Sequence, residues 1–200
     1  MKQRTKAVIY LSISLIVLAA GIVLWKIQSS SNAEKFPGMG GEFTLQSATG
    51  PISLNDFRGK IVLIYFGYTS CPDICPTSLG SLGAALKKLD PIQQQQIQPL
   101  FISIDPERDD LKNLQNYAHY FYPGMIGATG KVDYLKTLAQ RYGAYFRKVP
   151  MENSNLGYSM DHSSTIFVVG KDGRLTTMIQ HSNSATKILD VLKHLPEIHD

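Results

Sequence analysis

Apolar residues along the chain alternate between unbroken runs and helical periodicities. Residues 60–67 contain an unbroken apolar run, which is typical of a strand covered on both faces. Leucines then recur at spacings of three and four, which predicts a helix that begins near Cys75 and ends at Pro91. The same reasoning predicts further strands over 43–45, 51–53, 100–104, 125–128, 165–169 and 175–179, and further helices over 110–120, 132–142 and 184–195.

The order of these elements predicts the class of fold. Strand, helix, strand and helix are followed by a hairpin, whose turn is predicted by Asp172 and Gly173, and by a last helix. Parallel strands need crossover helices, whereas a hairpin pairs its strands antiparallel. The pattern therefore predicts a thioredoxin-like three-layer α/β domain with a central mixed sheet. Functional residues are expected where its strands lead into helices.

Residues 7–25 carry no charged side chain and are long enough to cross a bilayer as a helix, which needs about 20 apolar residues. Trp25 ends this segment, and an indole favours the membrane interface. A cleaved secretory signal is the alternative, since Ser31 and Ala33 flank Asn32 in a small-x-small pattern. The apolar segment exceeds the usual signal core of about 7 to 15 residues, which favours a retained anchor.

The chain is thus predicted to have four parts. Basic residues before the anchor tend to stay in the cytoplasm, so we expect the amino terminus inside and the folded domain outside. In a bacterium, this describes a single-pass protein of the inner membrane whose domain faces the periplasm. The parts are a cytoplasmic tail over 1–6, a transmembrane anchor over 7–25, a linker over 26–40 and the thioredoxin-like domain over 41–200.

Composition limits the number of domains and the kind of partner. A chain of 200 residues with 44% hydrophobic content is expected to bury one core. Its net charge of +4 comes partly from Lys2, Arg4 and Lys6, which lie outside that domain. No basic run interleaved with aromatic residues follows, so a nucleic acid is not expected as a partner. The membrane is the partner that the apolar segment indicates.

Cys71 and Cys75 are the only cysteines of the chain. They follow a buried strand and enter a predicted helix, where free N–H groups and the helix dipole favour thiolate over thiol. Side chains four positions apart lie on one helical face, so both sulfurs can share one soft metal ion or one disulfide. A structural disulfide is the simpler alternative in an exported domain. So short a loop is a poor place for one, because closing it removes little unfolded-state entropy.

Two thiolates do not complete a metal site, so a third ligand is expected from a distant segment. Among the five histidines, His162 has the best setting, because the polar loop 158–164 leads directly into the strand predicted over 165–169. In a thioredoxin-like sheet this loop lies beside the cysteine turn, where thioredoxins carry a cis-proline. The alternative is a histidine that only makes hydrogen bonds within its loop. No comparable setting surrounds His119, His181, His194 or His199.

Asp105 and Asp109 resemble an acidic metal-binding pair, but we favour structural roles for both. Pro106 directly follows the first of them and favours a rigid turn. Asp109 suits the N-cap of the helix predicted over 110–120. Asp73, between the cysteines, is expected either to stabilise the start of the helix or to tune the charge of the thiols.

Three segments, in this order, carry a resemblance to a known family: 67–76 with both cysteines, 103–109 with Asp-Pro-Glu-Arg-Asp, and 161–163 with Asp-His-Ser. The chain resembles the Sco/SenC family of membrane-anchored, copper-binding proteins with a thioredoxin fold, which help to assemble cytochrome c oxidase. The resemblance spans Gly41 to Leu195. Asp110 is a departure, since relatives often have threonine there, but it affects no expected ligand.

The resemblance implies that Cys71, Cys75 and His162 bind copper, as Cu(I), Cu(II) or both. It also implies that the partner is cytochrome c oxidase subunit II or a similar copper acceptor. Two mechanisms stay open, namely delivery of copper to the binuclear centre and reduction of the acceptor's cysteines. The alternative function is an envelope thiol-disulfide oxidoreductase that uses Cys71 and Cys75 as catalytic residues. Three residues between the cysteines instead of two, and the missing proline, argue for a metallochaperone rather than such an enzyme.

Overall fold

The structure is a computed structural model that describes residues 36–151, 157–181 and 184–198. Its strands are β1 (Thr44–Ser47), β2 (Gly50–Ser53), β3 (Ile61–Gly67), β4 (Ile97–Ser103), β5 (Ile126–Thr129), β6 (Phe146–Pro150), β7 (Tyr158–His162), β8 (Ile166–Val169) and β9 (Leu175–Ile179). Its helices are α2 (Ile74–Leu86), α3 (Pro91–Gln95), α4 (Leu111–Phe121), α5 (Val132–Arg141) and α6 (Ala185–Lys193), with the short 3₁₀ helices η1 (Leu54–Phe57) and η2 (Pro196–Ile198).

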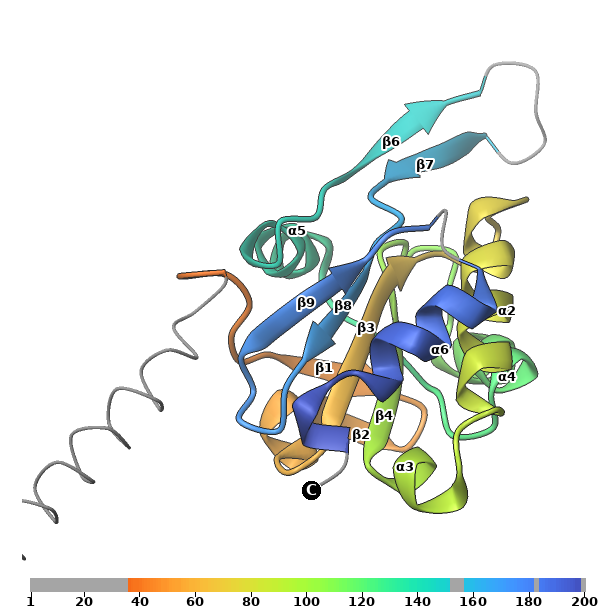
Figure 1. The fold of residues 1–200 in the computed structure, drawn as a ribbon. Helices are drawn as coiled ribbons and strands as arrows, with labels where there is room; N and C mark the ends of the chain where they lie inside the picture. Colours follow the sequence, from red (N-terminus) through yellow and green to blue (C-terminus); the bar gives the residue numbers. More distant parts are fainter. Residues whose placement is uncertain (1–35, 152–156, 182–183, 199–200) are drawn as a thin grey trace, which may run out of the picture. The chain divides into compact units, whose positions relative to one another are not determined.

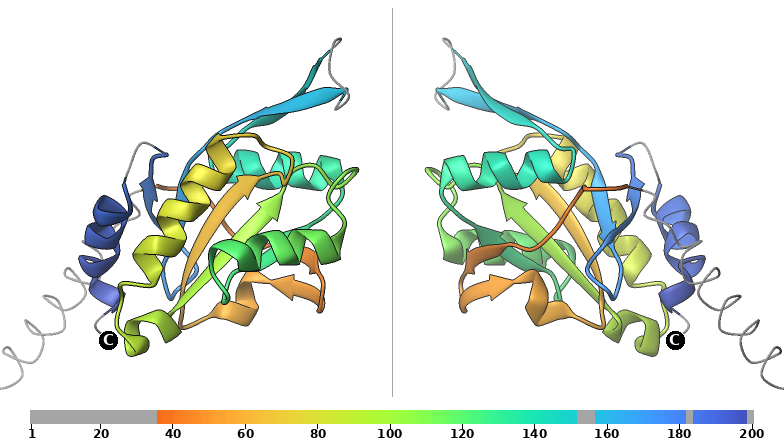
Figure 2. Two further views of the ribbon diagram at one scale, coloured as in Figure 1. Left: turned by 90° about the vertical axis from the view of Figure 1, so that its right-hand side faces the viewer. Right: turned by 90° about the vertical axis from the view of Figure 1, so that its left-hand side faces the viewer.

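A mixed sheet with the strand order β2-β1-β5-β4-β3-β8-β9 forms the centre of the domain. Strands β3, β4 and β5 run parallel, whereas β8 pairs antiparallel with β3, and β1 pairs antiparallel with β5. Figures 1 and 2 show α2, α4 and α6 on one face of this sheet and α5 on the other. The predicted central mixed sheet between layers of helices is therefore confirmed.

The core lies between this sheet and its helices. Every residue of β3 is buried, as its unbroken apolar run predicts. The recurring leucines of α2 and the turn after it are also buried. They are Leu79, Leu82, Leu86 and Leu89. Gly83 lets α2 approach α4 closely, because a Cβ atom at this position would lie 2.4 Å from the carbonyl oxygen of Phe121.

Strands β6 and β7 form a separate two-stranded ribbon, which projects from the rest of the domain (Figure 1). Their register pairs Phe146 with His162 and Lys148 with Met160. The prediction of a polar loop over 158–164 is wrong for this stretch. Residues 158–162 form strand β7, in which Met160 is buried and the other four residues are half-buried.

The largest difference between the predicted and observed helix ends is at α2, and the other predicted helix ends differ by at most two residues. Helix α2 ends at Leu86, and Pro91 begins α3 instead of ending α2. Asp90 caps α3 by accepting a hydrogen bond from the backbone N–H of Gln93, and proline fits the first turn because its missing N–H has no helical partner there. The buried Leu89 extended the apolar periodicity beyond the true end of the helix.

The folded unit includes the last residues of the predicted linker. Phe36 and Met39 pack against the core, and Gly40 forms an isolated β-bridge with Arg174. The predicted anchor over 7–25 lies outside the described residues. Within the described part of the chain, no helix is both long and apolar enough to cross a membrane.

Candidate metal centre

The turn from β3 to α2 places both cysteines at one end of the sheet. The N–H of Cys71 donates to the carbonyl oxygen of Tyr68 over 3.3 Å, which closes a tight turn after the strand. Cys75 lies in the first turn of α2 and is fully buried, while Cys71 is half-buried. The backbone N–H of Cys75 points at the sulfur of Cys71 over 3.4 Å. Both thiols are free.

Gly67, the last residue of β3, makes room for the buried sulfur. A Cβ atom at this position would lie 2.8 Å from Cys75 Sγ and 2.8 Å from the ring of Phe101. Any other residue at position 67 would therefore clash with the sulfur of Cys75 in its observed position. The sequence analysis missed this role, although Gly67 stands at the junction of the buried strand and the cysteine segment, where a glycine signals a close approach.

His162 reaches the cysteines from the end of β7. Its Nε2 lies 3.4 Å from Cys75 Sγ, and its Nδ1 lies 3.0 Å from the carbonyl oxygen of Ser163. A carbonyl only accepts hydrogen bonds, so Nδ1 carries a proton, and Nε2 is the ring nitrogen that faces the sulfurs. The rings of Tyr65 and Tyr68 stand edge-on to the imidazole, with centroids 6.2 and 5.8 Å away, and fix its orientation.

Three potential donor atoms therefore meet at this end of the sheet. The two Sγ atoms of Cys71 and Cys75 and one ring nitrogen of His162 all lie within 4.8 Å of one another. A bond from zinc to a thiolate sulfur is about 2.3 Å long, so two sulfurs bound to the same ion would lie at most about 4.6 Å apart. The three side chains need to draw together only slightly to hold a single ion.

The two thiols differ in acidity. The hydrogen bond from the Cys75 side chain lowers the pKa of Cys71 far below its ordinary value. The same hydrogen bond, together with burial, raises the pKa of Cys75. The prediction that both thiols ionise easily is therefore wrong for Cys75, because the hydrogen bond to Cys71 and burial both disfavour its charged form. Cys71 is therefore the more acidic thiol, and it accepts a hydrogen bond from the thiol of Cys75.

Two tyrosines keep the surroundings of the thiolate neutral. Burial raises the pKa values of Tyr65 and Tyr68, so both phenols keep their protons at neutral pH. Their rings add apolar surface around the imidazole without adding negative charge. A metal cation at this place would therefore be neutralised by the cysteines.

The carboxylate of Asp109 organises the cysteine loop instead of capping a helix. It accepts hydrogen bonds from the backbone N–H and the hydroxyl of Thr69, and from the hydroxyl of Ser103. The prediction of an N-cap at this position is wrong, because Asp110 caps α4 through the backbone N–H groups of Lys112 and Asn113. The expectation of a structural role for Asp109 is confirmed.

Two further aspartates lie near the site. Asp105 is buried and accepts hydrogen bonds from Arg108 and from the hydroxyl of Tyr158. Asp73 stands at the N-cap of α2 without a side-chain cap bond to the backbone, and it accepts a hydrogen bond from the Thr77 hydroxyl over 3.2 Å. None of these carboxylates belongs to the group of three donors.

The remaining histidines within the described residues lie outside this group. His181 meets the hydroxyl of Ser78 at 2.6 Å, and His194 bonds within α6 to the carbonyl oxygen of Asp190 at 2.8 Å. His199 falls outside the described part of the chain.

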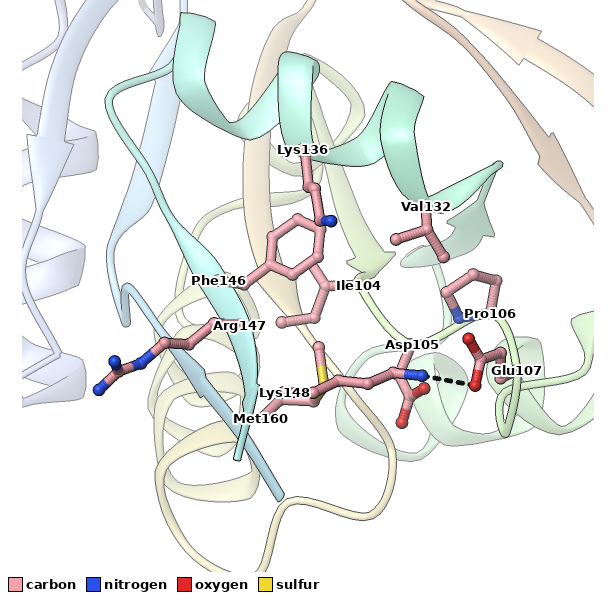
Figure 3. Close-up of a pocket in the computed structure, with 10 residues that line it drawn as sticks. All are labelled: Ile104, Asp105, Pro106, Glu107, Val132, Lys136, Phe146, Arg147, Lys148 and Met160. Carbon is pink, nitrogen blue, oxygen red and sulfur yellow. Dashed lines mark hydrogen bonds and ion pairs between the residues drawn. The ribbon is translucent and has the colours of Figure 1, made fainter. Parts of the chain in front are cut away.

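A pocket of about 300 Å³ lies beside β6 (Figure 3). Apolar side chains form its floor, and the ion pair between Lys148 and Glu107 stands at its edge. Neither cysteine nor His162 lines it, so it is separate from the donor group. Its lining residues are Ile104, Asp105, Pro106, Glu107, Val132, Lys136, Phe146, Arg147, Lys148 and Met160.

A thioredoxin-like mixed sheet with two thiols at a strand-to-helix turn, and one imidazole that reaches them from another strand, defines a class of metal-binding α/β proteins. The chain belongs to one family of that class, since the SCO1/SenC family model matches residues 31–197. The protein SCO2 homolog, mitochondrial, of Mus musculus is 35% identical over 179 residues, which are 88% of this chain and 70% of that protein.

Solved structures of the family share the fold. Apo Sco1 of Thermus thermophilus has a TM-score of 0.71 at 34% identity, over 80% of this chain and 94% of that one. ScoI of Arabidopsis thaliana, with copper bound, has a TM-score of 0.71 at 33% identity, over 80% and 98% of the two chains. A relative of this similarity holds copper, and this chain has a Cys-Cys-His group suited to it.

Proposed function

We propose that this protein binds one copper ion through Cys71, Cys75 and His162 and supports assembly of the binuclear copper centre of cytochrome c oxidase. The observation that carries the proposal is the convergence of these three donor atoms within 4.8 Å. The donor set alone also suits zinc. Copper is favoured because a structurally similar relative has copper bound.

The chemistry of the donors fits a carrier of copper. Thiolate and imidazole together suit Cu(I), while Cu(II) prefers further ligands in a more planar arrangement. The thiolate of Cys71 is available without a base, because its pKa is lowered by the hydrogen bond from Cys75. Copper binding therefore needs to release only one proton, that of the Cys75 thiol.

Unequal exposure of the ligands suggests an order of release. Cys71 and His162 are half-buried, whereas Cys75 is fully buried. We propose that the copper acceptor is oxidase subunit II. One of its thiolates approaches the copper on the exposed side and replaces Cys71 as a ligand first. The ion then leaves Cys75 last. Ligand exchange of this kind keeps the copper bound at every step.

A second candidate uses the same thiols for electron transfer to a disulfide, and the acidity of Cys71 favours it. The Cys71 thiolate attacks a disulfide of the acceptor, forms a mixed disulfide and releases one thiolate. Cys75 then loses its proton and attacks Cys71 Sγ, which releases the second thiolate. The acceptor gains two electrons, and this chain is left with a disulfide between Cys71 and Cys75.

The location follows from the predicted anchor. We propose that residues 7–25 hold the protein in a bacterial inner membrane with the copper domain in the periplasm. The full chain should then stay with the membrane fraction after a carbonate wash. A soluble protein whose first residue lies between 31 and 35 would instead show that the segment is a cleaved signal.

Copper titration of the reduced protein against a Cu(I) chelator tests the function. We expect one Cu(I) per chain, and a loss of affinity of more than about 100-fold in Cys71→Ser, Cys75→Ser and His162→Ala, since removing only an outer-shell partner costs about 10- to 100-fold. His181→Ala is the matched control and should bind like the wild type. Disulfide exchange that survives in His162→Ala would assign the imidazole to metal binding alone. Wild-type affinity in His162→Ala would contradict the proposal.

A further inference from the structure

A single turn of chain, residues 105–109, contacts both the strand that carries His162 and the loop that carries Cys71. We propose that Arg108 in this turn is a positioning residue, which holds the strand with His162 against the loop with Cys71 and so sets the copper affinity. The inference rests on the proposed copper site. Arg108 touches no donor atom and acts through Tyr158 and Tyr68.

Within the described residues, no β-ladder joins the histidine strand β7 to the main sheet. Its ladder is with β6, in a sheet of two strands. His162 is the last residue of β7 and projects toward Cys75. The position of its imidazole therefore depends on the contacts that fix this ribbon to the body of the domain.

Arg108 supplies those contacts on the histidine side. Its Nη1 donates to the backbone carbonyl oxygen of Tyr158, the first residue of β7, over 2.9 Å. Its guanidinium carbon lies 3.8 Å from the centroid of the Tyr158 ring. Asp105 joins the two, because it accepts hydrogen bonds from Arg108 Nε and from the Tyr158 hydroxyl. Asp105 is buried, so these bonds are shielded from water.

The same turn fixes the cysteine side. The guanidinium of Arg108 also lies 5.6 Å from the ring centroid of Tyr68, whose ring packs edge-on against the imidazole of His162. Asp109 binds the backbone N–H and the hydroxyl of Thr69, two residues before Cys71. The N–H of Asp109 donates to the carbonyl oxygen of Asp105 over 3.0 Å, so the turn is a closed unit.

An exposed ion pair adds little to this connection. Lys148 of β6 pairs with Glu107, and Figure 3 shows this contact at the edge of the pocket. Both side chains are about half exposed to solvent, and such pairs contribute little. Two hydrogen bonds of Arg108, from Nε to Asp105 and from Nη1 to the Tyr158 carbonyl, are made at a partly buried position and therefore carry the connection.

Arg108→Lys separates charge from geometry. Lysine keeps the positive charge but loses the planar fork that binds Asp105 and the Tyr158 carbonyl together. We expect the Cu(I) affinity to fall about tenfold, the lower end of the range for outer-shell changes. Tyr158→Phe, which removes only the hydroxyl bonded to Asp105, should lower it by a smaller factor in the same direction. The nitrogen hyperfine structure in the electron paramagnetic resonance spectrum of the Cu(II) form should weaken in Arg108→Lys.

Arg58→Lys is the matched control, because Arg58 also joins a backbone carbonyl, that of Asp172, to a carboxylate, that of Glu42. It precedes β3, at the opposite end of that strand from the cysteines. This variant should bind copper like the wild type even if its thermal midpoint falls.

A double variant separates positioning from general destabilisation. If Arg108 acts through His162, Arg108→Lys should lower the affinity of the wild type but cause no further loss in His162→Ala. An equal loss in both backgrounds, or wild-type affinity in Arg108→Lys, would overturn the inference while leaving the copper site in place. Absence of copper binding in the wild type would instead remove the proposed function, and the inference with it.

Discussion

Cys75 Sγ lies 3.4 Å from Nε2 of His162, although 87 residues separate them in the sequence. The register of the sheet explains this meeting. Tyr65 near the end of β3 pairs with Ile166 at the start of antiparallel β8. The chain just before β8 must therefore run beside the chain just after β3, which is the cysteine loop. The sheet thus brings the two segments close together, and the contacts of β7 then set the position of the imidazole.

Gly67→Ala tests the close packing behind Cys75. The new methyl group would lie 2.8 Å from the sulfur, so we expect the sulfur to shift, the Cu(I) affinity to fall and the free energy of unfolding to drop by about 1–3 kcal/mol. Chelator competition and urea denaturation measure the two effects.

Gly80→Ala is the control for that substitution. Gly80 lies in the same helix as Cys75, and a Cβ atom there meets nothing within 4 Å. This variant should keep its copper affinity and gain up to about 1 kcal/mol of stability, because alanine favours the helix over glycine. Equal behaviour of the two variants would contradict the packing role of Gly67.

The difference in acidity predicts unequal reactivity of the two cysteines in the reduced, metal-free protein. The lowered pKa of Cys71 keeps it ionised, so its alkylation by iodoacetamide should change little between about pH 6 and pH 8, whereas the rate of an ordinary thiol with a pKa of about 8.5 rises almost tenfold per pH unit there. Buried Cys75, with its raised pKa, should react far more slowly. Peptide mapping by mass spectrometry distinguishes the two sites.

Cys75→Ala tests the cause of this acidity. It removes the side-chain hydrogen bond that lowers the pKa of Cys71, so the alkylation rate of Cys71 should become pH-dependent. A rate that is steeply pH-dependent already in the wild type would refute the lowered pKa of Cys71.

Asp109→Asn tests the anchor of the cysteine loop. An amide keeps the shape of the side chain but turns one of its acceptors into a donor, which then faces the donors of Thr69 or Ser103. We expect a loss of about 1–3 kcal/mol in the free energy of unfolding, the cost of unsatisfied buried polar groups. Urea denaturation measures it.

The neighbouring Asp110→Asn provides the contrast. Asp110 is an exposed N-cap, and asparagine caps helices about as well as aspartate, so its unfolding free energy should stay almost unchanged. If both substitutions cost the same, the hydrogen bonds of Asp109 do not anchor the cysteine loop.

Much of the fold could be predicted from the sequence because its core strands and helices have strong periodic patterns. The run of β3 and the leucines of α2 depend only on burial, which the sequence encodes directly. The ribbon of β6 and β7 could not be predicted in this way, since β7 presents Tyr158 and Met160 among polar residues and β6 contains Arg147 and Lys148. A projecting ribbon buries too little surface to leave a clear pattern.

The candidate donors could be predicted, but their supports could not. Thiol and imidazole side chains are common metal ligands, and these three lie next to predicted buried strands. Cys71, Cys75 and His162 could therefore be identified from their residue types. Gly67 and Arg108 act through distance and contact, which depend on the packing of segments far apart in the chain. Asp109 and Asp110 are adjacent and chemically identical, so only the observed hydrogen bonds distinguish the loop anchor from the helix cap.

X-ray absorption at the copper K-edge tests the central claim most directly. The full-length chain, reduced and purified in detergent, would be loaded with one equivalent of Cu(I) per chain and compared with His162→Ala. The joint site of Cys71, Cys75 and His162 predicts two sulfur scatterers and one nitrogen scatterer in the wild type, and loss of the nitrogen in the variant. Identical spectra with sulfur alone would show that the imidazole does not bind the copper.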